Sequence, residues 1–150
     1  MKPTILIVHQ DDRDRKRMHG ILSNFEFDLI YTNDGLSGLQ AARYLKPDLV
    51  ICEIELKLID GLTLGKNIRN DEEISETPLI FLHHELDLVL IEEAKKLSSR
   101  AFLIKPYVDN SIIYGVKRGL RKAHLVTSAD RSPVPYEECF MNVSANQRYV

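Results

Sequence analysis

Five short apolar runs, separated by segments of helical period, constrain the fold of this chain more than any other feature of its sequence. Each run has the length and composition of a strand that is buried on both faces of a sheet. We expect strands at 4–8, 28–32, 48–52, 78–82 and 101–104. Strands that alternate with helices predict an α/β fold, a doubly wound, five-stranded parallel sheet with helices on both faces.

The segments between these strands carry apolar residues at helical spacing. In the first segment, over 13–25, Met18, Ile21, Leu22 and Phe25 share one face, which is typical of a helix that packs on a core. By the same pattern we expect further helices at 35–45, 62–69, 87–97 and 111–125.

The alternation of strands and helices ends near Leu125. Beyond it, Ser132-Pro133-Val134-Pro135 has the composition of a linker, and residues 136–150 show no clear period. We therefore divide the chain into a domain over 1–125 and a tail or linker over 126–150. The sequence leaves open whether this second segment packs on the domain or begins a further, truncated region.

The composition argues against several classes of function. A formal net charge of −2 gives no general attraction to nucleic acid, so we do not expect this chain to bind nucleic acid by itself. No apolar run is long enough to span a membrane, and the first residues lead into a strand rather than a signal peptide. Cys52 and Cys139 lack the spacing of metal ligands, and the reducing cytoplasm is the expected location.

The residues that follow the predicted strands are the candidates for a functional site. A doubly wound sheet places its crevice beyond the carboxyl ends of its strands. The residues there are His9-Gln10-Asp11-Asp12, Glu53, His83-His84 and Lys105-Pro106. No Gly-rich phosphate loop and no nucleophile–base pair stands out elsewhere, so we expect no catalytic residue and no enzyme.

Taken in order, several motifs resemble the receiver domain of two-component response regulators over roughly residues 3–124. The matching stretches are ILIV at 5–8, NDGLSGL at 33–39, KPDLVICEIEL at 46–56, DG at 60–61, TPLIFL at 77–82 and FLIKPY at 102–107. The resemblance implies a flavodoxin-like sheet of order 2-1-3-4-5. It also implies a site in which two acidic residues after the first strand and an acceptor Asp after the third hold Mg²⁺. A Lys, a Ser or Thr after the fourth strand, and an aromatic switch residue on the fifth complete the family's set.

This chain departs from the family at most of these positions. The acidic pair falls on His9 and Gln10, the acceptor on Glu53 and the hydroxyl residue on His83, whereas the lysine is kept as Lys105. The resemblance therefore implies an atypical pseudo-receiver that lacks the acceptor Asp. Mg²⁺ binding is expected to be lost or weak, and no cofactor is expected.

The resemblance also assigns switch positions, and it leaves open the roles of the acidic residues near the predicted site. Phe102 occupies the aromatic switch position, with His83 as the second switch residue. Asp11 is a minor candidate for a metal ligand, and Asp12 is expected to cap or open the first helix. Glu53 keeps a carboxylate but adds a methylene, so we expect an ion pair with Lys105.

A second hypothesis concerns the histidines. His9, Glu53 and His83 end neighbouring strands, and two imidazoles with a carboxylate suit a transition metal or a proton-responsive site. Lys105 points into the same crevice and would repel a cation. The simpler interpretation is that His83 hydrogen-bonds Glu53 or caps its strand, while His84 faces away as a loop residue.

The predicted helix over 87–97 carries more apolar residues than one buried stripe requires. We expect a protein-binding face made by this helix, the strand over 101–104 and the last helix. Its candidate residues are Leu86, Val89, Leu90, Phe102, Lys117 and Arg121. A second copy of the chain is one candidate partner, and cover by the tail is the competing interpretation.

Our leading hypothesis is a phosphorylation-independent protein-binding module. The alternatives are a weakened phosphoacceptor that uses Asp11, Glu53 and Lys105, or the metal- or proton-responsive site. The sequence does not name the partner, the stimulus or the output.

Overall fold

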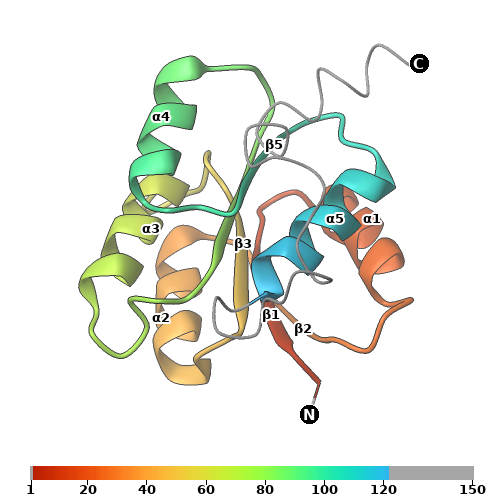
Figure 1. Cartoon of the computed structure of the whole chain (residues 1–150), viewed down its shortest axis with the longest axis horizontal. Coiled ribbons are helices and arrows are strands. Elements are labelled where there is room, and N and C mark those ends of the chain that lie inside the picture. Colours follow the sequence, from red (N-terminus) through yellow and green to blue (C-terminus); the bar gives the residue numbers. More distant parts are fainter. Residues whose placement is uncertain (1, 122–150) are drawn as a thin grey trace.

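Five parallel strands form one sheet in the computed structural model, which describes residues 2–121 of the 150-residue chain (Figure 1). The strands are β1 (Thr4–Val8), β2 (Asp28–Thr32), β3 (Leu49–Glu53), β4 (Leu79–His83) and β5 (Ala101–Ile104). All neighbours pair in parallel, in the order β2-β1-β3-β4-β5. The predicted doubly wound fold and its flavodoxin-like strand order are confirmed.

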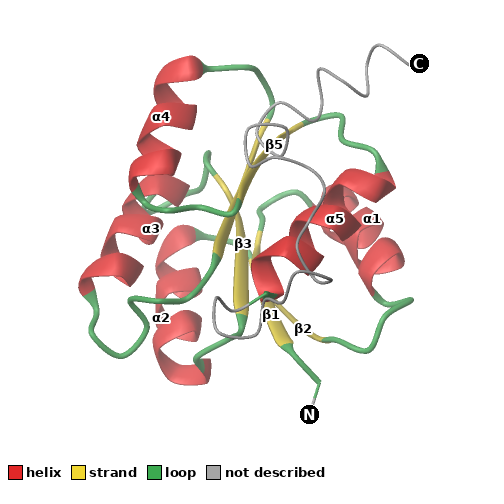
Figure 2. Cartoon of the chain, in the orientation of Figure 1, coloured by secondary structure: helices red, strands yellow, loops and turns green. Residues whose placement is uncertain are grey.

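Five helices cover the two faces of this sheet (Figure 2). They are α1 (Asp12–Leu22), α2 (Gly35–Leu45), α3 (Gly61–Asn70), α4 (Leu88–Lys96) and α5 (Asp109–Leu120). Helices α1 and α5 pack together on one face, while α2 and α3 pack together on the other. This cover on both sides explains why the strands are almost continuously apolar.

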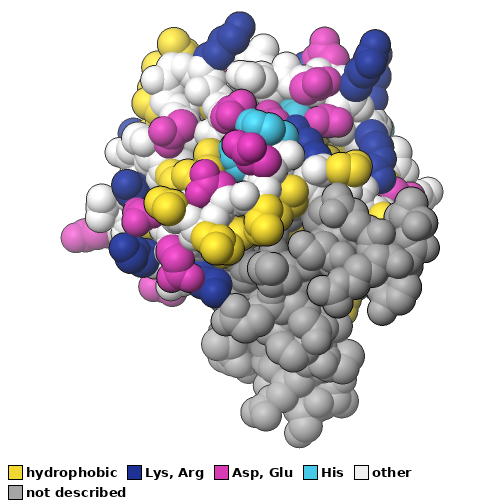
Figure 3. Space-filling view, turned by 90° about the horizontal axis from the view of Figure 1, so that it is seen from above, with side chains coloured by type: hydrophobic (Ala, Val, Ile, Leu, Met, Phe, Trp, Pro, Cys, Tyr) yellow, Lys and Arg dark blue, Asp and Glu magenta, His cyan; other side chains and the backbone are white. Residues whose placement is uncertain are grey.

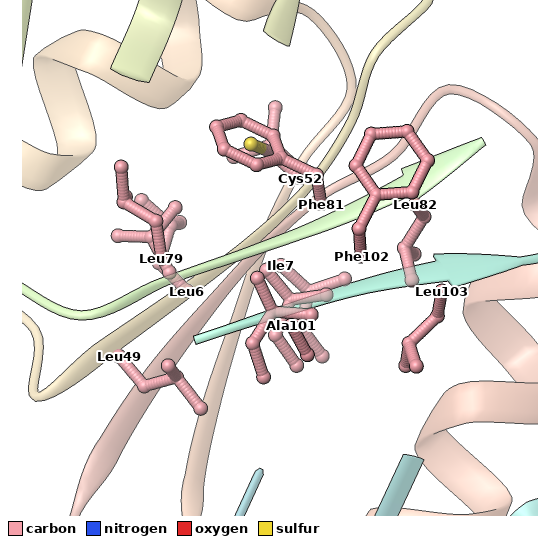
Figure 4. Packing of buried hydrophobic residues seen from close by; sticks show 14 of the residues in the cluster. Leu6, Ile7, Leu49, Cys52, Leu79, Phe81, Leu82, Ala101, Phe102 and Leu103 are labelled. Atoms are coloured by element: carbon pink, nitrogen blue, oxygen red, sulfur yellow. The ribbon is translucent and has the colours of Figure 1, made fainter. Parts of the chain in front are cut away.

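The core is built mainly from the strands themselves. In β1 the side chains of Ile5, Leu6, Ile7 and Val8 are all fully buried. Side chains leave both faces of the sheet and meet the helices above and below it (Figure 4). Cys52 is part of this packing as a small apolar side chain, and burial raises the pKa of its thiol.

Two strands extend one residue further than the apolar runs predicted. Glu53 and His83 are the last residues of β3 and β4, rather than the first residues after them. Both make ladder contacts, since Glu53 pairs with Leu82 and His83 with Ile104. The sheet therefore fixes the backbone of both polar residues.

The first helix ends at Leu22, earlier than the predicted Phe25. Ser23 N–H donates to the carbonyl of His19 at 2.9 Å, and the Asn24 side chain donates to that of Gly20 at 3.0 Å. The first is the last regular bond of the helix, whereas in the second the Asn24 side chain takes the place of the backbone N–H that a continued helix would use, so the chain leaves the helix there. At the other end of the domain, α5 begins at Asp109, before the predicted start at 111.

Four helices begin with an aspartate whose carboxylate accepts backbone N–H groups. Asp11, Asp34, Asp60 and Asp87 cap α1, α2, α3 and α4 in this way. Each cap fixes the residue at which a helix starts after its strand. Asp12 opens α1 as its first residue, which is one of the two roles expected for it, while Asp11 is the cap.

Gly61 lies directly against the carboxyl end of β3. Its N–H donates to the carbonyl of Ile54 at 2.8 Å, and a Cβ added to it would lie only 2.1 Å from the carbonyl oxygen of Glu53. A side chain does not fit at this distance. The start of α3 is therefore held close to residue 53.

Between residues 2 and 121, no helix is both long and apolar enough to cross a lipid bilayer. The predictions for Cys139, for the tail over 126–150 and for a last helix that continues to Leu125 lie outside the described residues.

We predict that Gly61→Ala destabilises the domain, because the new Cβ would force the Glu53 carbonyl and α3 apart. Gly20→Ala is the matched control, since nothing lies within 4 Å of a Cβ at this position inside α1. This control should be neutral or stabilise by up to about 1 kcal/mol. Urea unfolding followed by circular dichroism measures both changes, and equal effects at the two glycines would contradict the argument.

Candidate functional site

Four ionisable side chains from four elements meet at the carboxyl edge of the sheet. His9 directly follows β1, Glu53 ends β3 and Lys105 directly follows β5, while Asp14 lies in the first turn of α1. We call His9, Asp14, Glu53 and Lys105 the charge cluster. Figure 3 views this edge from above and shows histidine, acidic and basic side chains gathered there, although His9 itself is fully buried beneath the surface.

Lys105 is the cation of the charge cluster. Its Nζ lies 2.8 Å from Asp14 Oδ2 and donates a short hydrogen bond to Glu53 Oε1. Although burial by itself lowers the pKa of Lys105, the hydrogen bonds to Asp14 and Glu53 outweigh it and raise this pKa above its ordinary value. The ammonium group therefore stays charged and bridges the two carboxylates. This contact confirms the expected ion pair between Glu53 and Lys105.

His9 fills the interior of the charge cluster, with a side chain that is 0% exposed. Its Nδ1 accepts a hydrogen bond from the N–H of Asp11 at 3.1 Å, so the neutral ring carries its proton on Nε2. That nitrogen faces Asp14 Oδ2 at 3.4 Å. Burial lowers the pKa of His9, even though Glu53 and Asp14 act to raise it.

One contact within the charge cluster joins two acceptors. His9 Nδ1 lies 3.2 Å from Glu53 Oε2, but the neutral ring has no proton on that nitrogen. Among the described residues no donor reaches Oε2, although the oxygen is buried. A proton on Nδ1 would satisfy Glu53 but would displace the N–H of Asp11. The arrangement therefore couples the protonation of His9 to the backbone at the start of α1.

The residues next to His9 in the sequence do not join the charge cluster. Gln10 is exposed. Asp11 accepts from the N–H groups of Arg13 at 2.8 Å and Asp14 at 3.3 Å, and these bonds lower the pKa of its carboxyl. Asp11 is thus used as a helix cap, and it does not belong to either group of potential metal ligands among the described residues.

Asp14 is the member of the charge cluster that sequence reasoning missed. It lies beyond the motif after the first strand, inside a helix in which most of the other polar residues are exposed. The capping role of Asp11 is the signal that could have found it, because the cap places Asp14 in the first helical turn above the strand ends.

His83 lies apart from the charge cluster, so the predicted trio of His9, Glu53 and His83 does not form. The His83 side chain is buried, with its ring centroid 4.4 Å from that of His84 and 6.3 Å from that of Phe102. Burial lowers the pKa of His83, and the neighbouring His84 lowers it further. Contrary to expectation, His84 does not face away, since its ring lies against that of His83.

The residues of the predicted protein-binding face differ in exposure. Leu86 is 51% exposed and Val89 is 72% exposed, with Leu88 between them at 66%. Leu90 is half-buried, Lys117 is exposed and Arg121 is partly exposed. Phe102, in contrast, is fully buried and adds nothing to an exposed surface, because its ring packs in the core.

Comparison with known proteins shows what this arrangement resembles. The family model of the response regulator receiver domain matches residues 5–117. Over 80 residues the chain is 29% identical to the polar-differentiation response regulator DivK of Brucella anthropi. This aligned region covers 53% of this chain and 65% of DivK. The chain is also 26% identical over 122 residues to the DNA-binding response regulator MtrA of Mycobacterium tuberculosis. This aligned region covers 81% of this chain and 52% of MtrA. The chain therefore spans about half of the length of MtrA and slightly less than two thirds of DivK.

Solved structures give the same result for the fold. A putative response regulator from Chloroflexus aurantiacus superposes with a TM-score of 0.77 at 26% identity, over 81% of this chain and all of that one. The chemotaxis response regulator CheY4 of Vibrio cholerae, at 20% identity, superposes with a TM-score of 0.74 over 80% of this chain and all of that one, which supports the fold alone.

We predict that Lys105→Met lowers the free energy of unfolding by about 2 kcal/mol at pH 7, because the carboxylates of Asp14 and Glu53 lose their cation. The folded pKa of Lys105 is raised. Its stabilising effect is therefore complete below about pH 10.4 and is lost as the pH rises through the folded pKa. Urea unfolding at neutral and alkaline pH should show the difference between wild type and variant shrink at high pH.

Lys96→Met, which removes an exposed pair with Glu93, should cost less than about 0.5 kcal/mol, and an equal cost at both lysines would refute the bridging role.

We also predict that His9 titrates below its ordinary pKa of 6.5 in the folded protein. Because the folded pKa is lowered, His9 contributes stability that is present above about pH 6.5 and is lost as the pH falls toward the folded pKa. The NMR shift of the imidazole Cε1–H against pH measures the midpoint. Asp14→Asn should lower this midpoint further, since Asp14 acts to raise it, and a midpoint at or above 6.5 in the wild type would exclude the buried neutral state.

Proposed function

This chain belongs to the response regulator receiver domain family of two-component signalling, and on that premise we propose that it relays a signal by binding a protein partner without accepting phosphate. One observation carries the proposal. The carboxylate at the family's acceptor position, that of Glu53, is held by Lys105 at Oε1, while its Oε2 is buried against the His9 ring without a donor. A nucleophile in this state would have to break these contacts before it could attack a phosphoryl group.

The donor set of the charge cluster fits Mg²⁺ poorly. Mg²⁺ requires near-ideal octahedral coordination by oxygen atoms and keeps several water molecules. Here the position between Asp14 and Glu53 is taken by the Lys105 ammonium, and the third wall is the imidazole of His9, which is 0% exposed. We therefore propose that Mg²⁺ binding is lost or weak at this site.

The length of the Glu53 side chain supports the same proposal. Glutamate has one methylene more than aspartate, and the backbone of residue 53 is fixed by pairing with β4 and by the close approach of Gly61. The carboxylate therefore reaches further toward Lys105 than an aspartate at this position would. In a positioned reaction, a displacement of about 1 Å can cost roughly 100-fold in rate.

For the partner surface we propose the exposed apolar start of α4. The consecutive residues Leu88 and Val89, with Leu86 before them, expose apolar side chains that the core does not need. Lys117 and Arg121, which were expected on the same face, lie elsewhere, because α5 runs back to the other edge of the sheet, where Lys117 lies over Phe25 and Gly119 packs on Leu49 at the start of β3 (Figure 1). A protein with an apolar contact surface fits the start of α4, and a second copy of the chain is one candidate.

A specific observation also favours a second function, which is a response to protons. His9 lies between two carboxylates, and its protonation is linked to the N–H of Asp11 and therefore to the start of α1. A change of charge at this buried position would alter contacts in three elements at once. The weakened phosphoacceptor that uses Asp11 gains no such support, since Asp11 is occupied as a cap.

Native mass spectrometry after incubation with Mg²⁺ and acetyl phosphate tests the proposal. We expect the wild-type chain to keep its unmodified mass. The matched control is the triple variant His9→Asp, Gln10→Asp and Glu53→Asp, which restores the family's acidic set and should gain one phosphoryl group. A receiver domain with an intact acceptor Asp, treated in parallel, verifies the phosphodonor. A phosphorylated wild type that loses the modification in Glu53→Gln would overturn the proposal.

A further inference from the structure

A second group of potential ligands lies at the same edge of the sheet, outside the charge cluster. It consists of Glu55, His83 and His84, and its potential ligand atoms all lie within 4.8 Å of one another. His83 ends β4 and His84 follows it, whereas Glu55 lies in the segment between β3 and α3. None of these three residues takes part in the contacts of Lys105 and His9.

The separations within this group approach those of a metal site. His84 Nδ1 lies 3.6 Å from Glu55 Oε1, and the two imidazole rings are 4.4 Å apart between centroids and tilted by 56°. In tetrahedral coordination with metal–ligand bonds of about 2.1 Å, two ligand atoms are about 3.4 Å apart. Small rotations of the exposed Glu55 and His84 side chains would therefore bring the atoms to bonding distance, while the strand holds His83.

The charged neighbours distinguish this group from the charge cluster. In the charge cluster the Lys105 ammonium already occupies the space between the carboxylates, which excludes a second cation. The carboxylates of Glu55 and Glu85 lie 3.6 and 3.8 Å from the ring nitrogens of His84, and the described side chains that most affect the pKa of His83 include no lysine or arginine. These two carboxylates would attract a cation that the imidazoles bind.

The donor set selects the kind of cation. Imidazole nitrogen suits zinc, copper and nickel ions, whereas Mg²⁺ and Ca²⁺ prefer oxygen atoms alone. Two imidazoles and one carboxylate leave a fourth position open to water or to a group from a partner. Glu85 Oε1 lies 3.8 Å from His84 Nε2, where it can orient the ring of a bound histidine.

We propose that Glu55, His83 and His84 form a binding site for a divalent transition metal such as Zn²⁺. The bound ion ties the segment after β3 to the segment after β4. The latter leads through Leu86 into the exposed apolar start of α4, so metal binding orders the surface at which α4 begins. This site shares no residue with the charge cluster and stands whether or not Glu53 accepts phosphate.

Titration of the full chain with Zn²⁺ alone, by isothermal calorimetry and native mass spectrometry, tests this site. We expect one ion per chain. His84→Ala and Glu55→Gln change exposed side chains, so the fold should persist in both, and circular dichroism checks this. Each variant should weaken the affinity at least about tenfold, since loss of a mere supporting residue already costs roughly 10- to 100-fold.

Two variants serve as matched controls. His19→Ala removes an exposed histidine on α1, and Asp14→Asn removes a carboxylate of the charge cluster; neither should change the affinity. The proposal is overturned if the wild type retains no Zn²⁺, or if His84→Ala and Glu55→Gln bind as tightly as the wild type. Loss of binding in Asp14→Asn also overturns it, because the ion would then lie in the charge cluster.

Discussion

Burial of both faces of a parallel sheet is the constraint on which the rest of this molecule depends. The strands are lined by aliphatic side chains on either side, so a polar side chain can enter the sheet only where a strand ends. Parallel pairing brings the carboxyl ends of β1, β3 and β5 to one edge. The polar residues at these ends therefore meet in a region that is partly shielded from water, where each must find a partner of opposite charge or a hydrogen bond.

The charge cluster shows how this requirement is met without an external ion. Lys105 pairs with the two carboxylates nearest to it and offsets one of their two negative charges, and the resulting bridge links strand β5, strand β3 and helix α1. The unfavourable feature of this arrangement is Glu53 Oε2, which is buried beside an acceptor nitrogen of His9 and, among the described residues, receives no hydrogen bond. Because His9 is buried and Lys105 is charged, the pKa of His9 is lowered. In our proposal, the contacts that stabilise the domain also oppose the chemistry that the family performs at this edge.

The two groups of ionisable residues at the edge divide along the sheet. Those at β1, β3 and β5 enclose a lysine, whereas the group at β4 has carboxylates and imidazoles without an enclosed cation. The difference follows from position, since the Lys105 side chain extends toward Glu53 and Asp14 and His83 packs against Phe102 instead. The charge cluster thus contains its own cation, whereas the group at β4 is the one that we propose to bind a metal ion.

The sequence by itself determined the strands, their parallel pairing and the edge at which polar residues gather, because the apolar runs are short, local and unambiguous. It also determined the ion pair of Glu53 with Lys105, since both follow or end strands whose order the family resemblance supplied.

Only the tertiary structure decided which helical residues join them. Asp11 and Asp14 are equally acidic in the sequence, but the capping geometry of α1 turns one toward the backbone and the other toward Lys105. In the same way His83 was predicted to meet His9, and the packing of its ring against Phe102 and His84 directs it elsewhere. Such choices depend on distances of a few ångströms between elements far apart in the chain, and no local pattern of residues records them.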